Sequence, residues 1–420
     1  MAQLLAPVGE FTSLGIGKET TPGQAAVPTL FHTYTQFNPT PKNTAVARTG
    51  ARKRLGQSYP GTGSFIDGAT LDVEPTLDTL GQLLAFALGN QAAPSQTLVN
   101  TTVKTATTAG SNTVIAVSGG TGMVNIFVGC KLLVDTSTNM ETVTVLSVTG
   151  TSFTATTTKA HAQGVTIVNP TGGTAYSSLL KMGTPLPSFT VEHAVYNQGA
   201  AGSTFARDYV GCKVETLSLA MNNKGGLAPK FTLAAMSELI QASPATPSFS
   251  TLGIPTFENP QALAIYKAAV IGQSGEVSVL NWDITLANNL NKDYFSYGAG
   301  RIVGSFPEQQ RKVSAKMTLG FESNAQYQDF IGQANGGPAA TIPGVSLQLV
   351  VAGADMADPT NGFPYALWIT LPNLFIPQLQ TPGKSTGVLE QTIEFDAAES
   401  APGAGDDITI QLLNTATTAY

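Results

Sequence analysis

Charged residues are scarce in this chain of 420 residues, where they make up only 11% of the composition, less than half the share in an average soluble protein. Lysine and arginine number 21 against 27 aspartates and glutamates, so the net charge is −6. A protein that grips nucleic acid through its phosphates needs clustered excess basic residues, which excludes that role for the chain as a whole. The mild negative balance would still suit a surface past which nucleic acid moves without sticking.

Cysteine and histidine are equally rare. The two cysteines, Cys130 and Cys212, are too few for a disulfide framework and stand in apolar stretches, so we expect free, buried thiols. The three histidines lie far apart and form no HExxH pattern, and no GxxxxGKS loop occurs. The acidic pairs at 355/358 and 406/407 lack a calcium-loop pattern and are interpreted as surface acidity. We therefore expect no enzyme activity, no catalytic residue, no metal and no cofactor.

Long apolar runs are also missing. No stretch of 18 apolar residues is present, and the first residues lack the basic start and apolar run of a secretion signal. These features predict a protein without membrane insertion that is made in a reducing cytosol.

Glycine and proline, by contrast, are plentiful, with 43 and 25 residues. Together with many small polar residues they favour short strands joined by turns, hence a mainly β fold. Residues 211–219 alternate between polar and apolar, as expected of a strand with one wet face. Leucines at helical spacing predict a helix over 76–88, with Thr76 as N-cap, Asp78 in its first turn and Gly89 as the stop. A shorter helix is expected near 324–333.

Two segments divide the chain. Residues 97–169 are rich in threonine and valine and nearly free of charge, with short apolar runs separated by glycines, which predicts a small all-β module. Residues 241–257 hold three prolines and many small residues, which is typical of a linker.

An internal repeat is visible on either side of these segments. Residues 56–60 and 69–74 resemble 304–307 and 317–322 at an offset of 247–248, and a helix is expected after each copy. Further on, 187–191 resembles 344–349, and 211–219 resembles 365–371, at an offset smaller by nearly 90 residues. The difference places extra chain between residues 90 and 180 of the first copy. The alternative is two unrelated β domains with similar turns.

The chain resembles the tail tube (major tail) proteins of long-tailed bacteriophages. The resemblance is carried by Gly15-Ile16-Gly17-Lys18-Glu19-Thr20-Thr21-Pro22-Gly23, by 61–65 with Glu74 and the helix ending at Leu88-Gly89, by 209–219 and by 282–290. It covers nearly the whole chain outside the threonine- and valine-rich module. That module is similar to the Ig-like or decoration modules found on phage structural proteins.

The resemblance implies a tail-tube β-sandwich or barrel fold with a flanking helix, and with the repeat it implies two copies of that fold. The expected boundaries are 1–91 and 179–240 for the first copy, 92–178 for the inserted module, 241–257 for the linker and 258–420 for the second copy. Six such folds form each ring of a stacked tube, so three chains per ring are favoured over six. The protein would then be a virion protein, assembled in the host cytoplasm.

The expected partners follow from the same resemblance. They are other copies of the chain, the tape measure protein and DNA inside the tube, and the tail terminator and tail-tip proteins at its ends. Basic residues in loops are hypothesised to contact the next ring or subunit: Arg48, Arg52, Lys53, Arg54 and Arg301. Two other functions stay open, namely a surface adhesin or carbohydrate-binding protein and a hydrolytic enzyme of a tail tip.

Overall fold

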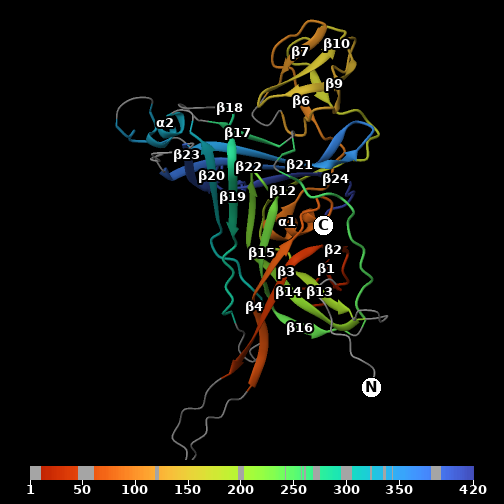
Figure 1. The fold of residues 1–420 in the computed structure, drawn as a ribbon, viewed down its shortest axis with the longest axis vertical. Helices are drawn as coiled ribbons and strands as arrows, with labels where there is room; N and C mark the ends of the chain where they lie inside the picture. Colours follow the sequence, from red (N-terminus) through yellow and green to blue (C-terminus); the bar gives the residue numbers. More distant parts are fainter. Residues whose placement is uncertain are drawn as a thin grey trace, which may run out of the picture.

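The structure is a computed structural model that describes residues 11–45, 61–118, 123–196, 203–241, 243–256, 258–259, 262–267, 275–294, 305–321, 324–333, 337–342, 344–379 and 389–420. These residues are mainly β, as the composition predicts, with strands β1 to β24 and the two helices α1 and α2. Figure 1 shows the chain as a long body with a separate small module at one end. Within the described ranges no helix is long and apolar enough to cross a membrane.

The elements before residue 100 are β1 (Thr12–Lys18), β2 (Leu30–Phe31), β3 (Tyr34–Ala45), β4 (Gly61–Val73), α1 (Leu80–Leu88) and β5 (Gly89–Gln91). Residues 30–37, a stretch of aromatic and β-friendly residues, are divided between two strands. The first part pairs with β1, while β3 continues as the partner of β4.

The small module consists of β6 (Asn100–Thr102), β7 (Gly110–Ala116), β8 (Lys131–Val134), β9 (Glu141–Val148), β10 (Ser152–Thr157) and β11 (Thr166–Val168). These strands form a six-stranded sheet of their own, separate from the rest of the chain. The module lies at the top of Figure 1, far from the lower end of β3 and β4.

The remaining strands up to residue 287 are β12 (Tyr176–Met182), β13 (Phe189–Tyr196), β14 (Ser203–Asn222), β15 (Ala228–Ala235), β16 (Ser237–Ile240), β17 (Leu263–Lys267), β18 (Gly275–Glu276) and β19 (Val279–Ala287). After them come β20 (Lys312–Gly320), α2 (Ala325–Ile331), β21 (Val345–Asp358), β22 (Phe363–Leu379), β23 (Glu390–Ala398) and β24 (Thr409–Asn414). Two of these strands, β12 and β24, are far apart in the sequence and pair with each other.

Eight strands lie side by side in the order β3–β4–β15–β14–β19–β20–β23–β22, which we call the long sheet. The pairing pattern of its two halves is the same. The run β3–β4–β15–β14 is matched by β19–β20–β23–β22, and the run β2–β1–β13–β14 by β18–β17–β21–β22. In each half a helix follows the second strand of the first run, α1 after β4 and α2 after β20.

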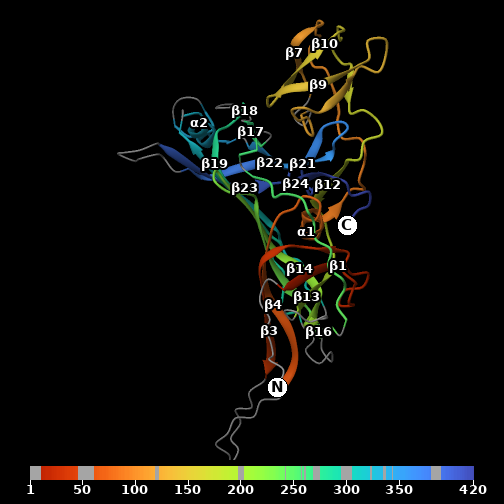
Figure 2. The same cartoon turned by 45° about the vertical axis from the view of Figure 1, so that its right-hand side comes forward.

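The main core lies on one face of the long sheet and surrounds α1, all nine residues of which are buried. In Figure 2 this helix, β1 and β13 lie together on one side of β14 and β4. The helix begins at Leu80, so the N-cap is Thr79 and the expectation of Thr76 was wrong. The Thr76 hydroxyl bonds that of Thr79 at 2.8 Å instead of a backbone N–H. Asp78 consequently precedes the helix, and the first turn holds no acidic residue.

The module is fixed to the second half of the long sheet by a shared apolar cluster. Phe127 and Cys130 of the module are buried together with Val350 of β21 and Trp368 of β22. The Phe127 and Trp368 rings meet edge to face, with centroids 5.9 Å apart. Both cysteines are free and buried, as predicted.

Hydrogen bonds support the same contact. The N–H of Lys131 donates to the carbonyl of Asn361 at 2.8 Å, in the turn between β21 and β22. Asp358 holds this turn by accepting the backbone N–H groups of Thr360 and Asn361. Asp358 is only 1% exposed, so its interpretation as surface acidity was wrong. Its carboxylate is used within the hairpin that carries the module.

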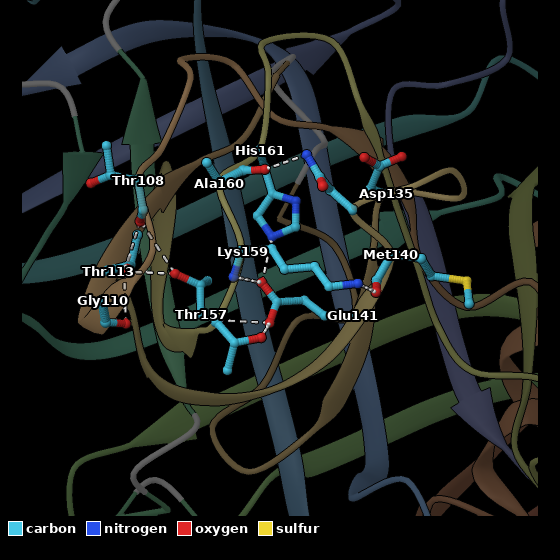
Figure 3. A network of polar contacts seen from close by, with 12 residues as sticks. Thr108, Gly110, Thr113, Asp135, Met140, Glu141, Thr157, Lys159, Ala160 and His161 are labelled. Atoms are coloured by element: carbon cyan, nitrogen blue, oxygen red, sulfur yellow. Dashed lines mark hydrogen bonds and ion pairs between the residues drawn. The ribbon is translucent and has the colours of Figure 1, made fainter.

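Inside the module, Glu141 and His161 form the polar contact at the centre of Figure 3. The Glu141 carboxylate accepts a hydrogen bond from His161 Nε2 at 2.7 Å. It also accepts hydrogen bonds from the N–H and the hydroxyl of Thr158 and from the N–H of Lys159. Burial raises the pKa of Glu141, but these donors outweigh it and hold that pKa below its usual range. The side chain of His161 is fully buried, and this pair holds a turn of the module in place.

Candidate functional site

The five basic residues expected to make ring or subunit contacts are Arg48, Arg52, Lys53, Arg54 and Arg301, and they all lie outside the described residues. Their role therefore stays a prediction. The feature that the described residues do define is the face of the long sheet that points away from the core, and we call it the polar face.

Alternation along the strands creates this polar face. On β14, Leu217 and Leu219 are buried in the core, while Thr216 and Ser218, which alternate with them, point to the other side. β19 alternates in the same way. The polar face is formed by ten hydroxyl or amide residues, four lysines and four carboxylates: Asn38, Thr40, Lys42, Thr70, Asp72, Lys230, Thr232, Thr216, Ser218, Asp283, Thr285, Lys312, Ser314, Lys316, Thr392, Glu394, Asp396 and Gln378.

Four lysines on the polar face each meet a carboxylate of the neighbouring strand. Two of these pairs join β20 to β23, with Lys312 2.9 Å from Asp396 and Lys316 3.3 Å from Glu394. Lys230 lies 3.5 Å from Asp72, and Lys42 contacts Asp67. Exposed pairs of this kind add little stability. Their effect is on the surface potential, because each positive charge is neutralised where it stands.

Lys292 extends this arrangement beyond the strands. Its Nζ lies 3.0 Å from Glu215 of β14 and 3.3 Å from Asp67 of β4, so it joins the segment after β19 to two strands of the first half. Burial lowers the pKa of Lys292, but the two carboxylates outweigh it and raise that pKa above its ordinary value. The same contacts hold the pKa of Asp67 low, chiefly through its hydrogen bond from Lys42.

The motif at 15–23 has a structural explanation in Glu19. This buried carboxylate accepts the N–H of Gly23 at 2.8 Å, the N–H of Gly211 at 2.7 Å and the hydroxyl of Thr190 at 2.8 Å. Gly211 has a φ of +64° within β14 and so occupies the left-handed region that favours glycine. Glu19 thus ties the segment after β1 to the point where β14 changes partners from β13 to β19.

Two neighbouring carboxylates deserve comparison with a hydrolytic site. Glu192 of β13 is opposite Asp208 of β14, and burial raises the pKa of both. Glu192 accepts the N–H of Ala245, and Asp208 accepts the side-chain amide of Gln241. Both carboxylates therefore anchor the segment after β16, which runs without helix or strand through 243–255. The burial of Glu192 and Asp208 is therefore explained by their structural role in holding this segment.

The buried carboxyl group of Asp329 in α2 should make the stability of the protein depend on pH. Burial raises its pKa to about 6, and the hydroxyl of Tyr266 donates to it at 3.1 Å. Since the folded state holds the proton more tightly than the unfolded state, this group costs stability as the pH rises from about 4 through 6. Asp329→Asn is expected to raise the free energy of unfolding at pH 8 by about 1–2 kcal/mol. Urea unfolding at pH 8 and pH 4 checks this, and an equal effect at both values would contradict it.

The two ends of the long sheet are open among the described residues. β3 pairs only with β4, and residues 375–379 of β22 pair only with β23. Phe375 stands at the second of these edges with 50% of its surface exposed. The first edge carries Pro39 and Pro41, which have no N–H to donate and are therefore tolerated where a strand lacks a further neighbour.

Comparison with known proteins agrees with this arrangement. A family model described as phage tail tube protein matches residues 182–397, just over half of the chain. The chain therefore belongs to the phage tail tube protein family, whose members are structural proteins of the virion tail. The match runs from β13 to β23 and includes the contact between β14 and β19. No curated protein matches the chain.

Sequence reasoning did not identify the polar face as a site. The signal was present, because threonine, serine and lysine alternate with buried residues along several strands. A single strand of that pattern predicts only one wet face. The face becomes a candidate site only when the pairing order places eight such strands next to one another.

Proposed function

We propose that this protein forms the wall of a bacteriophage tail tube by assembling into stacked rings, and that the polar face lines the conduit through which DNA is delivered. The observation that carries this proposal is the pairing of β14 with β19. Seven residue pairs, from Thr216↔Ala287 to Asn222↔Asn281, join the two halves into one continuous sheet. The ends of that sheet remain open, so the same kind of pairing can continue from chain to chain.

The repeated pairing pattern supports a duplication within the chain. We infer a first tail-tube fold from 1–91 and 179–240, a module inserted at 92–178, a linker over 241–257 and a second fold over 258–420. A ring of six folds then requires three chains, which gives a homotrimer with pseudo-sixfold symmetry. The junction between β14 and β19 serves as the model for each contact around the ring, and a heterologous contact of this kind closes into a ring when its rotation permits.

The charges of the polar face suit passage of DNA. Free lysines would bind phosphates and slow sliding, whereas lysines neutralised by a neighbouring carboxylate leave a weakly charged wall of hydroxyl groups. Lys316 with Glu394 and Lys230 with Asp72 show the arrangement. In this proposal the tape measure protein occupies the same lumen before DNA, and terminator and tip proteins cover the ends of the tube. Assembly takes place in the host cytoplasm.

Electron microscopy of the concentrated protein, with native mass spectrometry to count chains, tests the proposal. Hollow rings of three chains are expected. Rings of six chains would retain the tube function and contradict the duplication. A protein that remains monomeric at every concentration would contradict assembly into rings.

A further inference from the structure

Irregularities in strand pairing align the two halves of the chain residue by residue. Between β3 and β4 the register slips between Tyr34 and Gln36, and between β19 and β20 it slips between Val279 and Asn281. Such bulges fix a register, because a shift by one residue would turn every side chain to the other face. Gln36 therefore corresponds to Asn281, and six residues further along Lys42 corresponds to Ala287.

A second pair of bulges gives the same alignment independently. β14 and β15 slip between Val214 and Thr216, and β22 and β23 slip between Phe375 and Gln378. Thr216 therefore corresponds to Gln378. In the internal junction Thr216 is directly opposite Ala287. The positions equivalent to that pair are Gln378 and Lys42, which lie at the two open edges of the long sheet.

Phe375 indicates what is missing at the open edge of β22. Phe375 of β22 is opposite Asp396 of β23, and Lys213 of β14 is opposite Ala234 of β15. Because Asp396 and Ala234 are equivalent positions in the two halves, Phe375 occupies the position that Lys213 has on β14. In the internal junction the segment between β19 and β20 covers Lys213. The carbonyl of Phe306 accepts its Nζ at 3.2 Å, and Glu308 accepts it at 2.7 Å.

We propose that β22 of one chain pairs with β3 of a second copy in the register of the internal junction, with Gln378 opposite Lys42, and that prolines in β3 make this contact weaker than the internal one. The proposal rests on the proposed function and specifies its chain-to-chain contact. The strand that pairs with the open edge of β22 comes from a second copy of the chain, because the equivalent strands β14 and β19 are paired in the internal junction. The second copy would also cover Phe375.

The prolines distinguish the contact between chains from the contact within a chain. Pro39 and Pro41 occupy the positions of Ile284 and Leu286, which belong to β19 in the internal junction. A proline gives no backbone N–H to a neighbouring strand, so the contact between chains has fewer donors than the internal junction. Prolines on an edge also discourage pairing with unrelated strands. Separate chains therefore join less tightly than the two halves that the polypeptide already links.

Cysteine cross-linking of the full chain tests the register. Directly opposite residues have Cβ atoms about 4.5–5.5 Å apart, within reach of a disulfide, whereas a shift of two residues gives about 7–8 Å. Gln378→Cys with Lys42→Cys is expected to give covalently linked dimers and trimers in assembled rings under mild oxidation. Gln378→Cys with Thr40→Cys is the control out of register. Thr216→Cys with Ala287→Cys should form a disulfide within one chain whether or not rings assemble.

The outcomes separate this inference from the proposed function. Rings that cross-link through the control pair, or through neither pair, would overturn the register and leave the tube function intact. Absence of any ring in electron microscopy of the wild-type chain would overturn both. The two native cysteines are at most 1% exposed, so they contribute little background.

Substituting the prolines tests the second part of the proposal, which is that prolines in β3 weaken the contact between chains. Pro39→Thr with Pro41→Thr should lower the protein concentration at which half of the chains are in rings by about fivefold or more, as even one added hydrogen bond implies. Pro402→Thr, in an exposed turn after β23, should leave it unchanged. An unchanged or higher concentration for the β3 variant, with native unfolding behaviour, would overturn the weakening role of these prolines.

Discussion

Replacing Trp368 by alanine is expected to lower the free energy of unfolding by about 3–5 kcal/mol and to loosen the module from the long sheet. Trp368 is 2% exposed and belongs to the cluster shared by β22 and the module. Removal of the indole opens a cavity where Phe127 packs, and neither side can fill it without moving. Urea unfolding measures the loss, and limited proteolysis reports whether cleavage within 92–178 becomes faster than in the wild type.

The matched control is Trp368→Phe. Among the residues that the structure describes, the Nε1 of Trp368 has no hydrogen-bond partner, so phenylalanine loses volume but no polar contact. We expect less than half the effect of the alanine variant. A loss below about 1 kcal/mol for Trp368→Ala would show that the shared cluster does not hold the module.

Replacing Glu19 by alanine is expected to cost about 3 kcal/mol or more. The carboxylate accepts three hydrogen bonds, and two of their donors are the backbone N–H groups of Gly23 and Gly211. Hydrogen bonds to a charged group contribute about 1.5–3 kcal/mol each, and their losses do not simply add. Chemical unfolding at pH 7 measures the effect.

Glu74→Ala provides the comparison for Glu19, because Glu74 is exposed at the end of β4. A change within about 0.5 kcal/mol is expected there. Glu19→Gln keeps one acceptor and should lie between the two. Equal effects of Glu19→Ala and Glu74→Ala would contradict the proposed role of Glu19 in fixing the change of partners along β14.

Much of the fold could be predicted from the sequence, because a regular strand or helix is specified by the pattern of residues within its own segment. Alternation over 211–219 lies within β14, and the leucine pattern over 76–88 contains α1. The start of α1 was misjudged because the two threonine hydroxyls, Thr76 and Thr79, bond each other. The strand β24 has an ordinary sequence and is defined by its partners β12 and β22, which no local pattern reveals.

The repeat illustrates a different limit. Residue similarity matched 211–219 with 365–371, whereas the bulges align Thr216 with Gln378 within the long strand β22. Short alternating runs look alike at every shift of two residues, so similarity alone identifies the equivalent strand but not its register. The polar face was missed for a related reason, because its residues come from eight strands whose order depends on pairing across the whole chain.

The attachment of the module has a consequence for the outside of a tube. In the described parts of the chain there is one module, and it is packed on β21 and β22 of the second half. A ring of three chains would present six similar wall segments to the lumen but only three protrusions to the surroundings. The exterior would have lower symmetry than the interior, and every second segment would remain bare for other molecules to approach.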